Sequence, residues 1–147
     1  IDDLPVLRKL EQGVIEAERS FNDSIRNSNV IYYDLKALIS KSNSSLVVAE
    51  SEGKIVGSGY SLIKCSDPAF NHDKHAYMGF MFVDPEYRGQ GINKRIIETL
   101  KNWGSAQGIN DHYLEVYAKN ATAISAYQKI GFEPSLIEMK LKTEQNN

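Results

Sequence analysis

The chain has 147 residues, a length typical of one domain that can bury a sizeable core. Its 17 Lys and Arg nearly balance 19 Asp and Glu, and a net charge of −2 argues against a nucleic acid or an anionic membrane as partner. Cys65 is the single cysteine, which excludes an internal disulfide and a cysteine metal cluster. With no long apolar stretch and no signal-peptide pattern at the start, we expect a cytoplasmic protein.

The N-terminal part of the chain predicts two helices and a β-hairpin. Asp2 and Asp3 precede Pro5 and a run of leucines with helical spacing, so a first helix should begin here. Residues 30–39 predict a second helix. Residues 46–50 and 54–63 predict two strands, because the intervening segment ending in Gly53 is a strong turn signal.

The rest of the chain predicts alternating strands and helices. Strands are expected over 77–83 and 113–117, a helix after Ile92, and a connection over 102–110. Because the two strands are joined through a helix, they should run parallel. Polar and apolar residues alternate over 136–142, which predicts a last, half-exposed strand.

Residues 88–93 form a glycine-containing turn between strand 77–83 and the following helix. Gly89 and Gly91 permit a tight turn with several N–H groups pointing one way, and the helix start adds free N–H groups and a positive dipole end. With Arg88, the turn predicts an anion site for phosphate. A P-loop would need Lys and then Ser or Thr after the second glycine, and a dinucleotide fold needs glycine where Lys94 stands. A pyrophosphate held without an obligatory metal fits better; a plain surface turn with a helix cap is the alternative.

A second segment narrows the interpretation. Asn120, Ala123, Tyr127 and 131–132 follow the pattern N-x-x-A-x-x-x-Y-x-x-x-G-F, on a predicted helix that ends at a glycine. Together with the loop, this segment resembles the GNAT superfamily of acetyl-CoA-dependent N-acetyltransferases over residues 46–141. Residues 88–93 match the GNAT pyrophosphate loop, Q/R-x-x-G-x-G/A, except at its end, where Asn93 replaces the small residue.

The resemblance implies an α/β fold. The expected architecture is a single domain over 1–147, with a mixed, mostly antiparallel central sheet, a splayed parallel strand pair and flanking helices. Since the chain starts at Ile1 without Met, the first strand of such a domain is expected to be incomplete. Acetyl-CoA is the implied co-substrate, with an amine acceptor and no metal; a homodimer is left open. The implied cofactor-binding residues are Phe82, Val83, Arg88, Gly89, Gln90, Gly91, Ile92, Asn93, Asn120, Ala123 and Tyr127.

Acetyl transfer to an amine needs a group that removes the ammonium proton and a group that protonates the leaving sulfur. The resemblance gives Tyr127 the second role, whereas an isolated helical Tyr would be interpreted as a core aromatic. Glu115 is a candidate base, because its alternation with apolar neighbours could place it in the groove beside Tyr113 and Tyr117; a solvated strand residue is the alternative. Glu16, Glu18 and Arg19 fall where the family's acceptor-binding segment lies.

Two further residue groups suggest other chemistry. His72 and His75 form an H-x-x-H pair in a loop, which we interpret as solvated loop residues and not as metal ligands, because no Glu-bearing helical motif accompanies them. Cys65 without a His and Asp context predicts an ordinary thiol at a strand end and not a nucleophile.

The leading functional hypothesis is an acetyl-CoA:amine N-acetyltransferase that works by direct transfer in a ternary complex. One alternative is a protein N-terminal or lysine acetyltransferase. Another is a domain of the same shape that binds acyl-CoA as a sensor without turnover.

Overall fold

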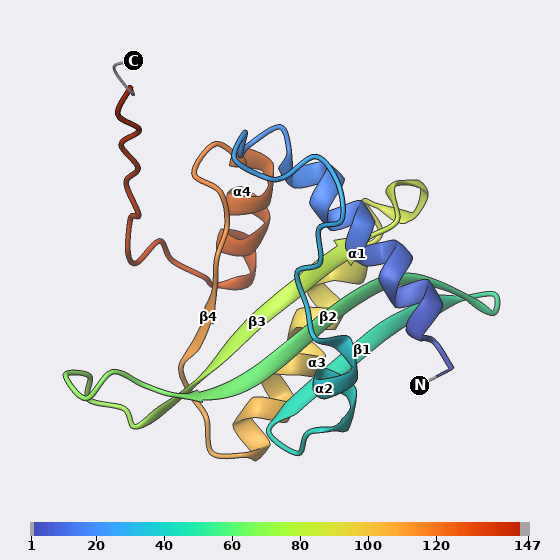
Figure 1. Ribbon diagram of the computed structural model, residues 1–147. Helices are drawn as coiled ribbons and strands as arrows, with labels where there is room; N and C mark the ends of the chain where they lie inside the picture. Colours follow the sequence, from blue (N-terminus) through green and yellow to red (C-terminus); the bar gives the residue numbers. More distant parts are fainter. Residues whose placement is uncertain (1, 145–147) are drawn as a thin grey trace.

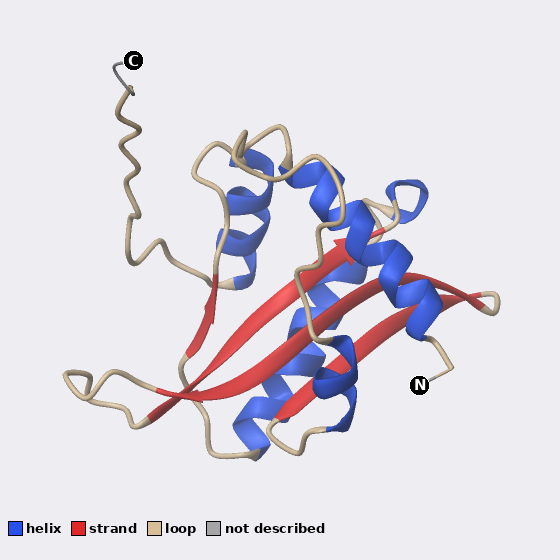
Figure 2. Ribbon diagram, viewed as in Figure 1, coloured by secondary structure: helices blue, strands red, loops and turns tan. Residues whose placement is uncertain are grey.

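The computed structural model describes residues 2–144 and holds one four-stranded sheet with helices on both faces (Figures 1 and 2). In chain order the elements are α1 (Leu4–Glu18), α2 (Leu35–Ser40), β1 (Ser44–Ser51), β2 (Lys54–Cys65), β3 (Lys74–Val83), the 3-10 turn η1 (Pro85–Tyr87), α3 (Ile92–Ala106), β4 (His112–Leu114) and α4 (Ala121–Ile130). The strand order is β1-β2-β3-β4; the first three strands are antiparallel neighbours and β4 runs parallel to β3. The predicted mixed α/β sheet is confirmed.

The sheet separates two hydrophobic clusters. Helices α1 and α2 cover one face, where Leu7, Leu35 and Phe80 are buried together, and α3 covers the other, where Met78 and Ile97 meet (Figure 1). Helix α4 adds to the second cluster, although none of its own residues is fully buried. Both faces of the sheet are therefore apolar.

A β-bulge interrupts β3 at Phe80. Ser58 pairs with Phe82 while Tyr60 pairs with Gly79, so β3 carries one residue more than β2 between these pairs. Phe80 takes the extra position with φ of 57°, although non-glycine residues rarely adopt the left-handed region. Because of the extra residue, Gly79 and Phe80 both face the α1 side, where a Cβ on Gly79 would lie 2.6 Å from the Tyr60 ring. The bulge thus changes which side chains of β3 face α1.

A buried carboxylate joins α1 to the segment that precedes α2. Glu11 has an exposed fraction of 0%, and its Oε2 accepts hydrogen bonds from the backbone N–H groups of Tyr32 at 3.1 Å and Tyr33 at 2.9 Å. Arg8 Nη1 donates to the Oε1 atom at 3.1 Å. These bonds hold residues 30–34 in a form without regular structure, so the helix predicted over 30–39 begins only at Leu35, after the N-cap Asp34.

Two other predicted boundaries were wrong. Helix α3 continues to Ala106, through residues expected to be a connection, because Gly104 packs against His112, where a Cβ would lie 2.8 Å from the ring. The C-cap is Gln107, and the chain turns away from the helix at the next residue, Gly108, whose φ is 80°. Strand β4 stops at Leu114, short of the expected residue 117, because β3 and β4 separate there and no other strand of the described residues pairs with the segment that follows.

The strand predicted over 136–142 does not form. These residues carry no regular structure and are exposed, and the segment leaves the molecule after α4 (Figure 1). Alternation of apolar residues indicates a strand, but a strand also needs a hydrogen-bonded neighbour, which the pattern does not supply.

None of the helices within residues 2–144 has the length and apolarity needed to cross a lipid bilayer.

We predict that Glu11→Ala lowers the free energy of unfolding by about 3 kcal/mol, because it leaves two backbone N–H groups without their acceptor and removes the carboxylate partner of Arg8, whose Nη1 keeps its bond to Tyr33 O. Denaturant unfolding measures the change. Glu16→Ala on the same helix is the matched control: the Glu16 side chain is 69% exposed in its ion pair with Arg19, so its loss should cost well under about 1 kcal/mol. Equal effects of the two variants would contradict the structural role of Glu11.

Candidate active site

The loop after β3 is built by local hydrogen bonds that turn the chain into α3. Asp84 N–H donates to Val56 O at 2.8 Å, and Asp84 Oδ1 accepts from Glu86 N–H at 3.0 Å to start η1. Gly89 and Gly91 then take positive φ values of 79° and 77°, which other residues adopt only with strain. The predicted tight turn is confirmed at both glycines.

The N-terminus of α3 offers free backbone donors. Gly91 is the N-cap and has no side chain to accept from them, and the first intrahelical bond within the described chain runs from Arg95 N–H to Gly91 O at 3.1 Å. The N–H groups of Ile92, Asn93 and Lys94 therefore have no helical acceptor, as in the first turn of any α-helix. Combined with the helix dipole, they form a site suited to a phosphate group.

Arg88 folds back onto the end of β3. Its Nε donates to Val83 O at 3.0 Å, and its guanidinium lies 5.7 Å from the centroid of the Phe82 ring. The side chain thus braces the loop while its Nη atoms, which the bond to Val83 does not use, remain donors. Gln90 and the two glycines are exposed, and Ile92 and Asn93 are half-buried in the first turn of α3. The Oδ1 atom of Asn93 is buried with no hydrogen-bond partner among the described residues.

The two parallel strands separate beside this loop. Pairing between β3 and β4 covers Ala76 to Met78 opposite His112 to Leu114, whereas β3 continues to Val83 (Figure 1). Beyond this point the outer edge of β3, including Phe82 and Val83, has no neighbouring strand within the described chain. The expected splay is present, and the bulge at Phe80 lies at its start.

Helix α4 borders the other side of the opening. Asn120 is its N-cap, with Oδ1 accepting from Ala123 N–H at 3.1 Å, and Gly131 ends it with φ of 118°. Tyr127 lies one turn before that end, packs against the Met78 cluster and meets the Phe132 ring edge-on at 5.9 Å between centroids. The pattern of residues 120–132 thus coincides with one helix, α4, which is capped at both ends.

Burial, with a smaller contribution from the negative charge of Glu18, raises the pKa of Tyr127 to about 12. The phenol is therefore protonated at neutral pH and can donate a hydrogen bond or a proton.

A cluster of carboxylates and phenols lies on the α1 side of the opening. Burial raises the pKa of Glu18, opposed in part by a hydrogen bond from the Tyr32 phenol. Burial and then the charge of Glu115 raise the pKa of both Tyr60 and Tyr77. Glu18 at the end of α1 and Glu115 after β4 both act on Tyr77, so the two carboxylates share one electrostatic environment.

Two further tyrosines flank Glu115 along the chain. Tyr113 is the middle residue of β4, opposite Tyr77 in the register and 5.1 Å from His75 between ring centroids, and Tyr117 stacks on Phe21. The sequence did not predict the roles of Tyr60 and Tyr77, because both occur within ordinary apolar strands. Glu16 and Arg19 form an exposed ion pair with each other at 2.8 Å.

The loop between β2 and β3 forms a separate polar network. Ser66 Oγ lies 2.7 Å from His72 Nδ1 and 2.9 Å from His75 Nδ1, and His72 Nε2 lies 3.1 Å from the Tyr113 hydroxyl. Both histidines are half-buried, so the expectation of solvated loop residues was wrong. Burial and then the neighbouring His72 lower the pKa of His75. Across residues 2–144 no group of three or more His, Cys, Asp and Glu side chains is placed to hold a metal ion.

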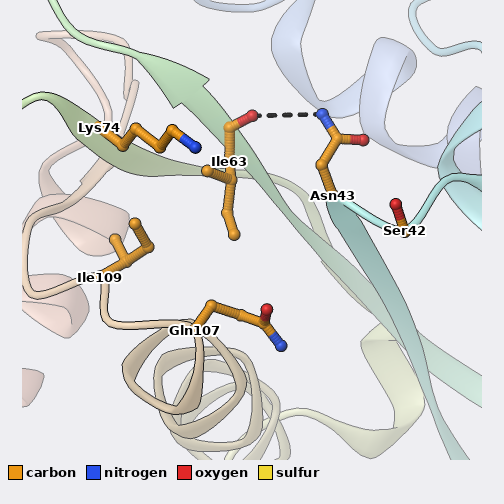
Figure 3. Close-up of a pocket in the computed structure, with 6 residues that line it drawn as sticks. All are labelled: Ser42, Asn43, Ile63, Lys74, Gln107 and Ile109. Carbon is orange, nitrogen blue, oxygen red and sulfur yellow. Dashed lines mark hydrogen bonds between the residues drawn. The ribbon is translucent and has the colours of Figure 1, made fainter.

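A pocket lined by Ile63, Lys74 and Gln107, among others, lies at the opposite end of the sheet (Figure 3). Lys74 begins β3, whereas the splay opens at its end, so this pocket is remote from the candidate site. Cys65 is exposed at the end of β2, as predicted for an ordinary strand-end thiol.

Comparisons with known proteins agree with this geometry. Human N-acetyltransferase 8 is 33% identical over 98 residues, which cover 67% of this chain and 42% of that relative. A Bacillus halodurans protein of known structure superposes with a TM-score of 0.83 at 26% identity, covering 97% of this chain and 95% of that one. A predicted acetyltransferase from Clostridium acetobutylicum, solved with acetyl-CoA, shares the fold with a TM-score of 0.74 at 16% identity, covering 96% and 90% of the two chains.

The chain spans less than half the length of the human relative. The model of the acetyltransferase (GNAT) family, in contrast, matches residues 12–132, which include the glycine loop, the splayed strands and α4. The chain belongs to the GNAT family of acetyltransferases.

Proposed function

We propose that this chain is an acetyl-CoA:amine N-acetyltransferase that transfers the acetyl group directly within a ternary complex. The observation that carries the proposal is the convergence of three features at one opening. These are the free amides at the start of α3, the unpaired edge of β3 and the buried phenol of Tyr127. Together they provide an anion site, a backbone edge for an extended chain and a proton donor.

The site fits acetyl-CoA along its length. The pyrophosphate would lie on the amides of residues 89–93, with the Nη donors of Arg88 beside it. The pantetheine arm would follow the free edge of β3 near Phe82 and Val83. Asn120 and Ala123 lie at the start of α4, the helix on the far side of the opening. Their proposed contribution is to position Tyr127 and to contact the pantetheine arm. Asn93 keeps its backbone N–H, which is the group the phosphate requires, despite its larger side chain.

The proposed chemistry follows from the raised pKa values of Tyr127 and Glu18. A neutral amine attacks the thioester carbonyl, the C–S bond breaks, and the sulfur takes a proton from Tyr127, whose pKa near 12 keeps it protonated until charge develops. The amine proton goes to a carboxylate. Glu115 is the base proposed from the sequence, and the structure adds Glu18 as a second candidate, because burial raises its pKa and favours the protonated carboxyl.

The same carboxylates favour a cationic acceptor. Glu18 and Glu115 place negative charge next to Tyr32 and Tyr77, and phenols beside carboxylates suit an ammonium through charge and cation–π attraction. An amine that carries further positive charge is therefore the acceptor class that we propose.

The direct test is a panel of amines assayed for thiol release from acetyl-CoA, alongside calorimetric CoA binding. Release that depends on a cationic amine supports the proposal. Tight CoA binding without release for any amine or peptide would instead establish a non-catalytic acyl-CoA sensor.

We predict that Arg88→Ala weakens CoA binding by about 1.5–3 kcal/mol, because it removes a charged donor and the brace on Val83. Calorimetry measures the change, and Lys101→Ala at the far end of α3 is the charge-matched control. Arg88→Lys separates the two contributions, since Lys keeps the charge but lacks the Nε donor. Wild-type affinity in Arg88→Ala would remove this residue from the cofactor site.

Tyr127→Phe should lower kcat and kcat/KM together by about 10²-fold or less, because the phenol proton matters most as charge builds on sulfur, and a thiolate leaves readily. CoA affinity should stay near wild type, since the ring contacts remain. Tyr113→Phe makes the same chemical change away from the splay and should have no effect. A Tyr127→Phe variant with wild-type kcat would show that the residue only packs.

The two candidate bases can be separated by pH. If Glu18 accepts the amine proton, kcat/KM should rise with pH through a pKa above the ordinary 4.5, because burial favours the protonated carboxyl. Glu18→Gln should abolish this rising limb of the pH profile. Glu115→Gln should then lower the rate without removing the limb, and Glu98→Gln on α3 is the neutral control. A limb lost only in Glu115→Gln would assign the base to Glu115.

A further inference from the structure

Tyr117 joins the two sides of the opening. It belongs to the connection between β4 and α4, and its hydroxyl accepts a hydrogen bond from Asn22 Nδ2 at 2.9 Å. Its ring stacks on Phe21, with 6.3 Å between the ring centroids and 22° between the ring planes. Figure 1 shows the loop after α1 meeting this connection beside the start of α4. We refer to the hydrogen bond and the stack together as the Tyr117 bridge.

On one side the bridge is anchored to the main chain of Glu18. The Glu18 carbonyl oxygen accepts hydrogen bonds from Phe21 N–H at 2.9 Å and from Asn22 N–H at 3.0 Å. Asn22 Oδ1 accepts from Ser24 N–H at 3.0 Å, so the amide group is oriented with Nδ2 towards the Tyr117 phenol. Both residues that contact Tyr117 are therefore fixed relative to the last residue of α1.

On the other side the bridge is anchored to α4. The Tyr117 carbonyl oxygen accepts a hydrogen bond from Asn120 N–H at 2.9 Å, and Asn120 is the N-cap of α4. Tyr127 lies on that helix, within the electrostatic reach of Glu18, whose charge contributes to its raised pKa. Tyr117 thus contacts one segment through its side chain and the other through its carbonyl group.

Few other contacts fix these two segments relative to each other. The register of β3 and β4 ends at Met78 opposite Leu114, so within the described residues no strand pairing holds the connection that follows. The main packing partners of α1 are α2, β2 and β3, and α4 is not among them. A hydrogen bond and an aromatic stack across the opening therefore have a large share in fixing its width.

We propose that Tyr117 is a positioning residue, which fixes Glu18 relative to Tyr127 by holding the end of α1 to the start of α4. This role rests on the proposed function, because these two residues are a candidate proton acceptor and the proton donor of that reaction. The Tyr117 hydroxyl is bound to Asn22 and its carbonyl oxygen to Asn120, so it acts through its neighbours and not on the reacting atoms. Without the bridge the two sides can move apart, and the amine and the thioester then spend less time aligned for attack.

The width of the opening can be measured without any reaction. Spin labels are attached at Ala17→Cys on α1 and Lys129→Cys on α4, both exposed positions, and Cys65→Ser removes the native thiol. Electron spin resonance of this doubly labelled chain then gives the distribution of distances between the two helices. We expect one narrow distribution, because the bridge holds the helices at a fixed separation.

Two variants break the hydrogen bond from opposite sides. Tyr117→Phe keeps the stacked ring but loses the hydroxyl, and it should broaden the distance distribution. Asn22→Ala should broaden it at least as much, since it also loses the bond to Ser24. Adding Tyr117→Phe to Asn22→Ala should broaden it no further, because the bond is already broken. Asn27→Ala, at an exposed position of the same loop, is the matched control, and an unchanged distribution in Tyr117→Phe would overturn the proposal.

Kinetics then decide whether the bridge serves the reaction. With an amine that is acetylated, Tyr117→Phe should lower kcat by about 3- to 10-fold, the scale of one lost hydrogen bond. CoA affinity measured by calorimetry should stay near wild type, because the amides of residues 89–93 lie at the start of α3, away from the bridge. The loss in kcat should shrink in the Tyr127→Phe background, where the acid that the bridge positions is absent.

The outcomes separate a positioning role from a structural one. An unchanged kcat in Tyr117→Phe, or an equal loss with and without the Tyr127 hydroxyl, would refute the positioning role and leave a contact that only stabilises the fold. If no amine is acetylated, the proposed function fails, whereas the distance measurement still decides whether Tyr117 holds α1 to α4.

Discussion

The separation of β3 from β4 is the constraint on which the rest of the structure depends. Parallel pairing lasts from Ala76 to Met78 on β3, after which the two strands have no main-chain contact. Unpaired backbone inside a sheet is costly unless a ligand or water satisfies it, so a splay of this kind persists where the fold holds it open. Here α1 and α3 hold β3 from both faces, and α4 stands on the far side of the opening.

The bulge at Phe80 makes the splay compatible with a closed core. Without the extra residue, Phe82 would face α3; with it, Phe82 packs under α1 at Gly13, where a Cβ would lie 2.7 Å from the ring. A phenylalanine with positive φ stores backbone strain, and Ser58 Oγ offsets part of it by donating to Phe80 O at 3.0 Å within the core. The strain therefore lies next to the opening and sets the direction of the β3 edge that borders it.

Groups of opposite charge lie on the two sides of the opening. The α3 end presents backbone N–H groups and the Arg88 guanidinium, whereas the α1 side presents Glu18 and the phenols around it. The two sides thus suit ligand groups of opposite charge, and Tyr127 is a neutral donor within the field of Glu18. Burial raises the pKa of both Glu18 and Tyr127, which is the condition that the proposed proton transfers require.

The sequence by itself determined the features that depend on neighbouring residues. The glycines at 89 and 91, the Asn120 cap and the Gly131 stop act within a few residues, and each is found as predicted. The hairpin around Gly53 and the parallel order of β3 and β4 follow from similarly local rules of turn and connection. Only the tertiary structure decided the bulge at Phe80, the meeting of Glu18 with the phenols of Tyr32 and Tyr77, and the absence of helix in residues 30–34, which Glu11 holds. It also decided that 136–142 has no partner strand within the described residues. These features arise between residues far apart in sequence, where burial and hydrogen-bond geometry override the local pattern.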